Sequence, residues 1–160
     1  MSSVKGRLGM GAVVAAAIAI ATPIVTKYEG YAAKVYIDPV GISTYCYGET
    51  VNPVPGRLYS EEYCRDLLSG RLGGFIRQVR KDVPSSVYMT PSELAAWGSF
   101  SYNVGSAAFR KSTAFQLLSQ GKHVAACNQL SKWVYAGGKK FKGLVNRRAV
   151  EQAMCLRDYK

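Results

Sequence analysis

The feature that most constrains this chain is an apolar segment near its N-terminus, Leu8 to Val25, which contains no charged residue. Its length is at the lower limit, about 18 residues, for an α-helix that spans a bilayer. Lys5 and Arg7 precede it, and basic residues before a span keep that end in the cytoplasm. The segment is rich in Ala and Gly and contains Pro23, so it is only weakly hydrophobic. This pattern favours export of the protein, with residues 1–25 as a separate N-terminal segment.

Three interpretations of this segment remain open. It could be a cleaved signal peptide, because Ala-Ile-Ala at 19–21 is an acceptable small-x-small cleavage site. It could also be an uncleaved anchor whose hold on lipid is marginal. The third interpretation is a buried helix of a globular protein. A pore former is disfavoured, because one weakly apolar helix precedes a long globular part.

The four cysteines, Cys46, Cys64, Cys127 and Cys155, are even in number and far apart in sequence. None forms a CxxC pair and the only histidine is His123, so we expect no metal site and no cofactor. Well-separated cysteines suit disulfides, which require an oxidising compartment. Three pairings are possible, and four free thiols in a cytosolic protein are the alternative.

The chain is strongly basic, with 21 Lys and Arg against 10 Asp and Glu and a formal net charge of +11. Such a charge indicates polyanionic surroundings, for example nucleic acid, an anionic membrane surface or a negatively charged cell wall. The densest basic cluster, at 137–143, is not the long block typical of nucleic-acid tails. No helix-turn-helix, zinc-finger or RNA-recognition motif is present. The net charge alone keeps a nucleic-acid-binding module without enzymatic activity as the alternative function.

The pattern after residue 25 predicts an α+β domain with a small β element followed by a mostly helical body. Thr22 and Pro23 are typical of a helix start, which predicts a short helix that ends near Glu29. Alternation and turn residues predict a hairpin within 31–50. Further predicted elements are a loop at 51–57, a long helix from Ser60 to about Asp82, a helix opened by the capping box at 90–93, and helices near 112–119, 123–133 and 144–157.

The segment YEGYAAKVYIDPVGISTYCYGET, residues 28–50, carries the candidate reactive groups. Glu29 lies at a predicted helix end, Asp38 in a turn and Thr44 on the second predicted strand. Two carboxyl groups and a hydroxyl across a cleft can protonate a leaving oxygen and hold a water. The spacing alone is commonplace, because a solvated helix end and an Asp-Pro turn also account for the two acids.

The same segment resembles the active-site signature of the phage-type lysozymes, the endolysins of glycoside hydrolase family 24. In that signature a Glu is followed by Asp or Cys and then by Thr, and Glu29, Asp38 and Thr44 match it position for position. SFSYNVGSAAFRKST at 99–113 and GLVNRRAVEQ at 143–152 resemble the family's central helix and its C-terminal signature. The resemblance therefore extends over most of the chain after the apolar segment.

The resemblance implies a phage-type lysozyme fold for residues 26–160. In this α+β fold a small β-containing lobe and a larger helical lobe are linked by a long helix, with a cleft between them. It also implies an endolysin that hydrolyses the β-1,4 bond between N-acetylmuramic acid and N-acetylglucosamine in peptidoglycan and lyses the host cell. We expect inversion at the anomeric carbon, a monomer, and no nucleic-acid partner.

Site residues are carried over from the family by position. Glu29 resembles the general acid, Asp38 the second catalytic carboxylate and Thr44 the residue that helps to hold the attacking water. Tyr102 and Asn103 fall on the stretch that lines the saccharide cleft, with Asn128 as a neighbour across it. Glu49 stands where the family often has His, so an ion pair made by that His is not expected here.

Among the possible pairings we expect Cys46–Cys64, which would tie a strand to the following helix, and Cys127–Cys155, which would join two C-terminal helices. Resembling endolysins also possess a signal-anchor-release segment. Residues 1–25 would then tether the exported protein to the inner membrane on its periplasmic side. With residues 8–25 in lipid, Glu29 would be held at the membrane surface and the enzyme would be inactive. Release would let the segment pack as the first helix of the domain.

Overall fold

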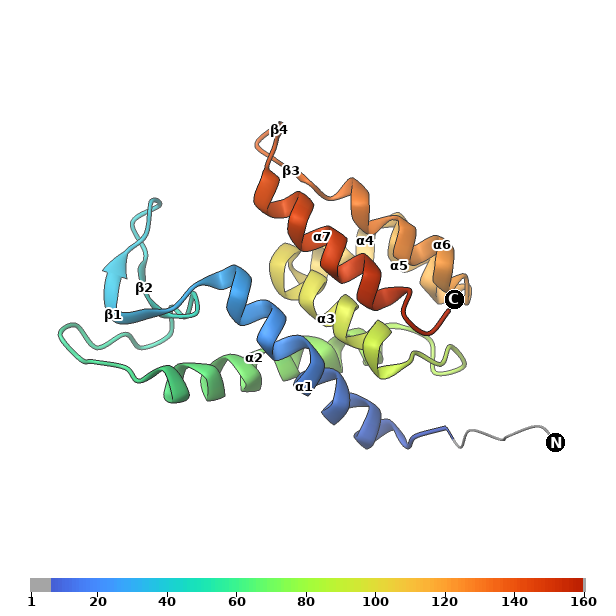
Figure 1. Cartoon of the computed structure of the whole chain (residues 1–160), viewed down its shortest axis with the longest axis horizontal. Helices are drawn as coiled ribbons and strands as arrows, with labels where there is room; N and C mark the ends of the chain where they lie inside the picture. The colour runs from blue at the N-terminus through green and yellow to red at the C-terminus, as the bar shows by residue number, and fades with distance from the viewer. Residues whose placement is uncertain (1–6, 160) are drawn as a thin grey trace.

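A single helix, α1 (Met10–Glu29), opens the fold in the computed structural model, which describes residues 7–159 (Figure 1). The predicted helix start at Thr22 is wrong, because Pro23 lies inside α1 and Thr22 Oγ1 donates to Ile18 O at 2.7 Å. An interior proline costs a helix about 3 kcal/mol. The buried stripe of α1 offsets this cost by packing against the rest of the domain; it consists of Val13, Ala17, Ala21 and Val25.

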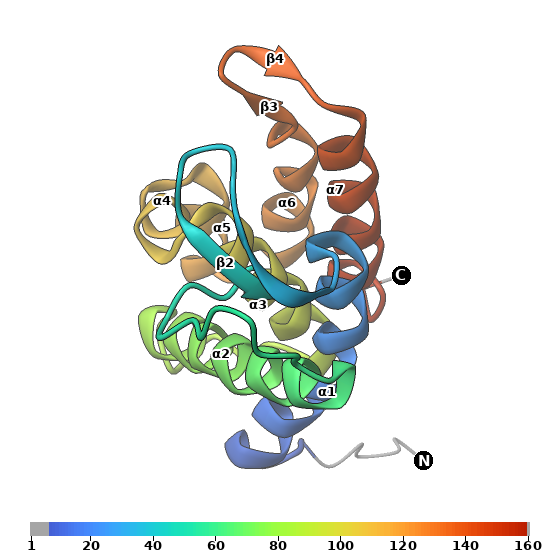
Figure 2. The same ribbon diagram turned by 90° about the vertical axis from the view of Figure 1, so that its left-hand side faces the viewer.

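The predicted hairpin is confirmed as β1 (Ala32–Ile37) and β2 (Ser43–Cys46), which pair antiparallel. Tyr36 lies opposite Thr44 in this register. The small lobe formed by the hairpin stands apart from the helical body in Figure 1, and in Figure 2 it lies in front of that body. The α+β architecture with two unequal lobes is therefore as expected.

The long helix α2 (Glu61–Asp82) runs from the hairpin to the helical body, as predicted for the connector (Figure 1). Ser60 Oγ caps it by accepting from the Tyr63 N–H at 3.1 Å. A disulfide between Cys46 and Cys64 ties β2 to the first turn of α2, which is one of the two expected pairs.

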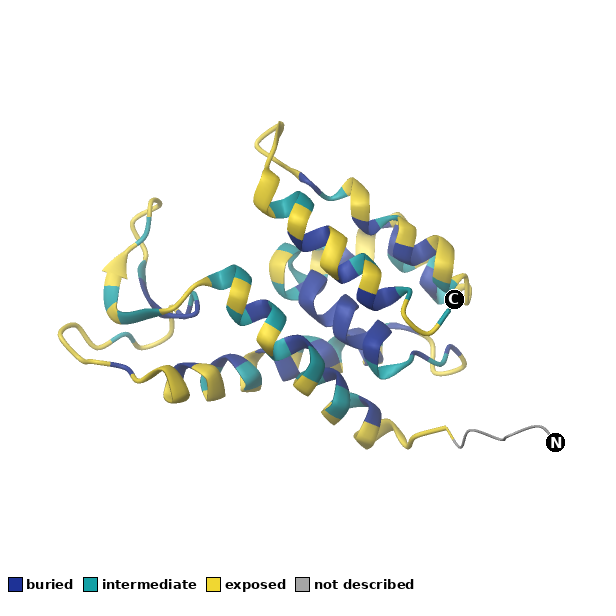
Figure 3. Cartoon of the chain, viewed as in Figure 1, coloured by how far each residue is buried: buried dark blue, intermediate teal, exposed yellow. Residues whose placement is uncertain are grey.

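The central helix α3 (Pro91–Val104) is almost wholly buried and packs against α1, α2 and the C-terminal helix (Figure 3). Thr90 Oγ1 accepts from the Glu93 N–H at 3.2 Å, so the predicted cap is present. The second half of the predicted capping box is absent among the described contacts. The Glu93 carboxylate is fully buried and instead accepts from the Tyr159 hydroxyl at 2.5 Å and contacts His123 Nδ1 at 2.8 Å.

The remaining elements close the helical body. The helix predicted over 123–133 ends at Asn128 and continues as a 3₁₀ turn. The hairpin after it was not predicted, although Gly137 and Gly138, both at positive φ, are typical of its tight turn. A second disulfide, Cys127–Cys155, is the other expected pair. These elements are α4 (Ser106–Lys111), α5 (Thr113–Ser119), α6 (His123–Asn128), η1 (Leu130–Lys132), β3 (Tyr135–Ala136), β4 (Lys139–Lys140) and α7 (Lys142–Cys155).

Candidate active site

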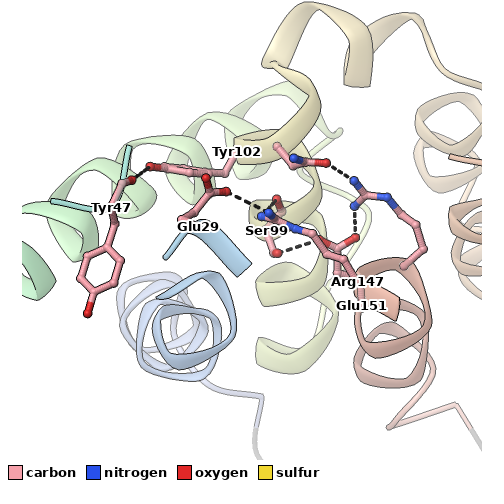
Figure 4. A network of polar contacts seen from close by, with 8 residues as sticks. Glu29, Tyr47, Ser99, Tyr102, Arg147 and Glu151 are labelled. Carbon is pink, nitrogen blue, oxygen red and sulfur yellow. Dashed lines mark hydrogen bonds and ion pairs between the residues drawn. The ribbon is translucent and has the colours of Figure 1, made fainter. Parts of the chain in front are cut away.

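Glu29 is the last residue of α1, and Gly30 ends the helix with a positive φ of 73°. Its Oε1 accepts from Arg147 Nη1 of α7 at 2.8 Å (Figure 4). The Glu29 side chain is 23% exposed and that of Arg147 only 4%, so the ion pair closes the inner side of the carboxylate. The other oxygen, Oε2, faces Gly48, where an added Cβ would lie 3.7 Å away. No described hydrogen bond involves Oε2, so this oxygen remains available to contact a ligand.

Arg147 also donates hydrogen bonds to residues of α3 and α7. Its Nε donates to Glu151 Oε1 at 3.1 Å and its Nη2 to the Ser99 carbonyl at 3.3 Å. The Ser99 hydroxyl donates to the same Glu151 oxygen at 2.7 Å. Figure 4 shows Ser99, Arg147 and Glu151 close together on one side of Glu29. The guanidinium is thus fixed at two of its nitrogens before it reaches the candidate acid.

Arg148 occupies the opposite side of Glu151. It donates through Nη1 to Glu151 Oε2, through Nη2 to Asn103 Oδ1, and through Nε to the Trp133 carbonyl at 3.0 Å. Burial lowers the pKa of the Arg148 guanidinium, and the adjacent Glu151 carboxylate opposes that shift. No site role was predicted from the sequence for Arg147, Arg148 or Glu151. The available signal was the helical spacing of two basic residues and a Glu within GLVNRRAVEQ.

Asp38 and Thr44 are brought together by the turn of the first hairpin. Asp38 Oδ1 accepts from the backbone N–H groups of Val40 at 2.9 Å and Ile42 at 2.8 Å. The Ile42 carbonyl accepts from the Asp38 N–H at 2.9 Å and from Thr44 Oγ1 at 3.0 Å. Thr44 is 4% exposed. Within residues 7–159 no hydrogen bond joins this pair to Glu29, and neither Asp38 nor Thr44 lines the cavity that contains Glu29.

A cavity of about 410 Å³ opens beside the candidate acid. Arg147 and Asn103 form part of its wall, and Asn103 is exposed as a ligand-binding side chain should be. Two larger cavities, of about 530 and 630 Å³, are lined by none of the predicted catalytic residues. The residues that line the 410 Å³ cavity are Tyr28, Glu29, Asn103, Ala136, Phe141, Gly143, Leu144 and Arg147.

The other two predicted substrate-binding residues lie outside this cavity. Asn128 is exposed on α6, where its Oδ1 accepts from Gln152 Nε2 at 3.0 Å. Tyr102 packs edge-on against Phe75, and its hydroxyl donates to the Tyr47 carbonyl at 3.5 Å. Burial raises the pKa of the Tyr102 phenol to about 12, which the Arg71 guanidinium opposes and the nearby carboxylates reinforce. Tyr102 is therefore a neutral hydrogen-bond donor at any physiological pH.

Glu49, which stands where the family often has His, stabilises the turn after β2. Its Oε1 accepts from the N–H groups of Thr50 at 2.8 Å and Val51 at 3.0 Å and lies 3.3 Å from Arg71 Nη1. The residue thus makes an ion pair of its own with the long connector helix.

The fold agrees with comparisons to known proteins. The family described as Phage lysozyme matches residues 26–151. A SAR-endolysin of Bacteriophage PS119 is 41% identical over 92% of this chain and 91% of its own length. A SAR-endolysin of Enterobacteria phage P21 is 36% identical over 96% of this chain and 93% of its own.

Solved structures show the same fold. A mutant lysozyme of phage P22 is 26% identical and superimposes with a TM-score of 0.76, covering 86% of this chain and 95% of its own. The active form of the P1 phage endolysin Lyz, 19% identical, has a TM-score of 0.77 and covers 97% of this chain and 98% of its own. Because the profile match covers most of the chain and relatives above 30% identity span nearly its full length, the chain belongs to the phage lysozyme family.

Proposed function

We propose that this chain is a signal-anchor-release endolysin that cleaves the β-1,4 bond between N-acetylmuramic acid and N-acetylglucosamine in peptidoglycan. Membership of the phage lysozyme family supports the glycosidase activity, and the SAR-endolysin relatives support the export route and the lysis of a host cell. The observation that carries the proposal is the Glu29–Arg147 pair at the wall of an open cavity. The net charge of +11 suits an anionic cell wall and needs no nucleic-acid partner.

The proposed reaction begins with proton transfer from Glu29 Oε2 to the glycosidic oxygen. The bond from that oxygen to the anomeric carbon breaks, and positive charge develops on the sugar ring. Glu29 is left as a carboxylate 2.8 Å from Arg147 Nη1, and a charge-assisted hydrogen bond is strongest in that ionised state. Arg147 therefore stabilises the negative charge that appears on the acid as the bond breaks.

The hairpin pair supplies the second half of the proposed reaction. Asp38 Oδ1 is occupied by two backbone N–H groups, so Oδ2 is the oxygen that takes a proton from the attacking water. Thr44 Oγ1 helps to hold that water next to Asp38. The water oxygen bonds to the anomeric carbon from the face opposite to the leaving group, and the configuration inverts. Such a reaction needs roughly 6.5–9.5 Å between the two carboxyl groups.

The proposed tether rests on the dual character of α1. This helix is long and apolar enough to cross a membrane by length and composition, yet here it packs against α2 and α3. With α1 in lipid, its buried stripe would leave the domain and Glu29 would be separated from Arg147. We therefore infer that the tethered protein is inactive in the periplasm and that release of α1 assembles the site. The released enzyme is expected to act as a monomer.

The test is digestion of purified peptidoglycan followed by mass analysis of the products. Glu29→Gln should lower kcat by about 10²–10⁴-fold, because it removes the acid and keeps the shape of the side chain. Glu62→Gln is the matched control, since Glu62 is an exposed residue in the first turn of α2 and should keep wild-type activity. Products should carry N-acetylmuramic acid at the reducing end. Near-wild-type digestion by Glu29→Gln, or reducing N-acetylglucosamine ends, would refute the assignment.

A further inference from the structure

Glu151 is a wholly buried carboxylate that takes no part in the proposed chemical steps. It lies on α7, one helical turn after Arg147, and is 0% exposed. Both of its oxygens are occupied: Oε1 accepts from the Ser99 hydroxyl and from Arg147 Nε, and Oε2 accepts from Arg148 Nη1 (Figure 4). A carboxylate with three charge-assisted or hydroxyl donors is strongly localised.

The two arginines lead from Glu151 to two different residues of the cavity wall. Arg147 continues through Nη1 to Glu29, and Arg148 continues through Nη2 to Asn103. A guanidinium is planar and rigid, so fixing Nε and Nη2 of Arg147 also fixes the direction of its Nη1. Glu151 therefore determines where the partner of the candidate acid can lie.

The charges in this group also balance. Two buried arginines face two carboxylates, Glu29 and Glu151, and buried charges persist only when they are paired. A residue needed only for neutrality could contact either arginine at any nitrogen. Glu151 instead contacts each arginine at a nitrogen other than the one that reaches the cavity wall.

We propose that Glu151 is a positioning residue for glycoside cleavage: it holds Arg147 against Glu29 and Arg148 against Asn103. The inference rests on the proposed role of Glu29 as the acid. Its consequence is that loss of the Glu151 carboxylate impairs the chemical step beyond the loss of stability that any buried charge would cause. A purely structural residue would lower stability and leave the chemistry of the folded enzyme unchanged.

The chain contains a matched control for this distinction. Glu93 is also a wholly buried carboxylate with side-chain partners, His123 and Tyr159, but it lies at the start of α3 and makes no described contact with the cavity wall. Glu151→Gln and Glu93→Gln each remove one buried negative charge and conserve shape. Thermal unfolding of both variants gives a temperature at which each is folded, and kcat, KM and the pH profile are then measured on soluble peptidoglycan fragments.

For Glu151→Gln we expect kcat to fall by up to about 100-fold, the size of effect that a misplaced catalytic group produces. Its pH–rate profile should also differ from that of the wild type, because Arg147 and Arg148 would then lie near Glu29 without the Glu151 carboxylate between them. Glu93→Gln should have a lower Tm with wild-type kcat and an unchanged pH profile. If Glu151→Gln does not fold, Ser99→Ala is the second variant that tests the role of Glu151, because it removes one hydrogen-bond donor to Glu151 without changing a charge.

Ser99→Ala should lower kcat several-fold with little change in KM, and should speed hydrogen exchange at the Arg147 Nε–H, measured by NMR. Equal losses of kcat in folded Glu151→Gln and Glu93→Gln overturn this inference alone, as do wild-type kcat and exchange in Ser99→Ala. A wild-type protein that does not cleave peptidoglycan overturns the proposed function together with this inference.

Discussion

The exposed face of α1 allows membrane release to be tested without disturbing the folded domain. Gly11, Ala15 and Ala19 are spaced four residues apart and are all exposed, and they lie on the side of the helix away from the buried stripe. An added Cβ at Gly11 meets nothing within 4 Å. Leucine at these three positions therefore makes α1 more apolar and leaves its packing against α2 and α3 intact.

The size of the effect follows from the added carbon atoms. The triple leucine variant gains about ten carbons, and each carbon transferred to lipid contributes about 0.8 kcal/mol, for an upper limit of about 8 kcal/mol in favour of the membrane. In the released protein these side chains lie in solvent and contribute no packing energy. Even a quarter of the upper limit, about 2 kcal/mol, shifts the balance toward the membrane about 30-fold.

The assay compares lysis time and the distribution of the protein between membrane and soluble periplasmic fractions after induction. The leucine variant should remain in the membrane fraction and fail to lyse cells on schedule, whereas serine at the same three positions should release at least as early as the wild type. Detergent-extracted leucine variant should still digest peptidoglycan, because its site residues are unchanged. Timely lysis by the leucine variant with normal soluble protein would refute release of α1 as the activating step.

Two further predictions concern packing and stereochemistry. Gly98→Ala should destabilise the domain by about 1–3 kcal/mol, because its Cβ would lie 2.3 Å from Ile76 Cγ1. In an Ile76→Ala background, Gly98→Ala should be neutral or stabilising, because the nearest remaining atom, Ile76 Cβ, lies 3.5 Å from the added Cβ. Additive unfolding free energies in the double-mutant cycle would contradict this expectation. Proton NMR of the first-formed cleavage product should show the α anomer, and a β anomer appearing first would exclude inversion.

Elements set by local chemistry were predictable from the sequence. Ser60 and Thr90 cap their helices as expected, because a cap needs only a hydroxyl and an N–H group three residues later. The first hairpin followed from alternation and turn residues. The error at Pro23 arose because a helix-start signal is also local, whereas the buried stripe that carries α1 through the proline depends on helices far along the chain.

The partners of the site residues were not predictable, because they are distant in sequence. Arg147 lies 118 residues from Glu29, and Ser99 lies 52 residues from Glu151. The Glu93 side chain matched a capping box, but its buried carboxylate turns to His123, 30 residues away. Family resemblance indicated the candidate reactive carboxyl groups, and only the packed helices reveal which side chains contact them.

The position of Glu29 at the end of α1 links release of the helix to assembly of the charged site. In the packed state α1 contacts α3 and Glu29 reaches Arg147, which Glu151 and the Ser99 carbonyl also hold. Without Glu29 the same group would contain two arginines and one carboxylate, and its charge would be unbalanced. Docking supplies the missing negative charge, and the ion pair therefore favours the packed state of the helix as well as the chemistry. The residue proposed as the acid is thus also the charge that completes the interface, which gives one physical reason for an active site that begins directly at the end of the apolar helix.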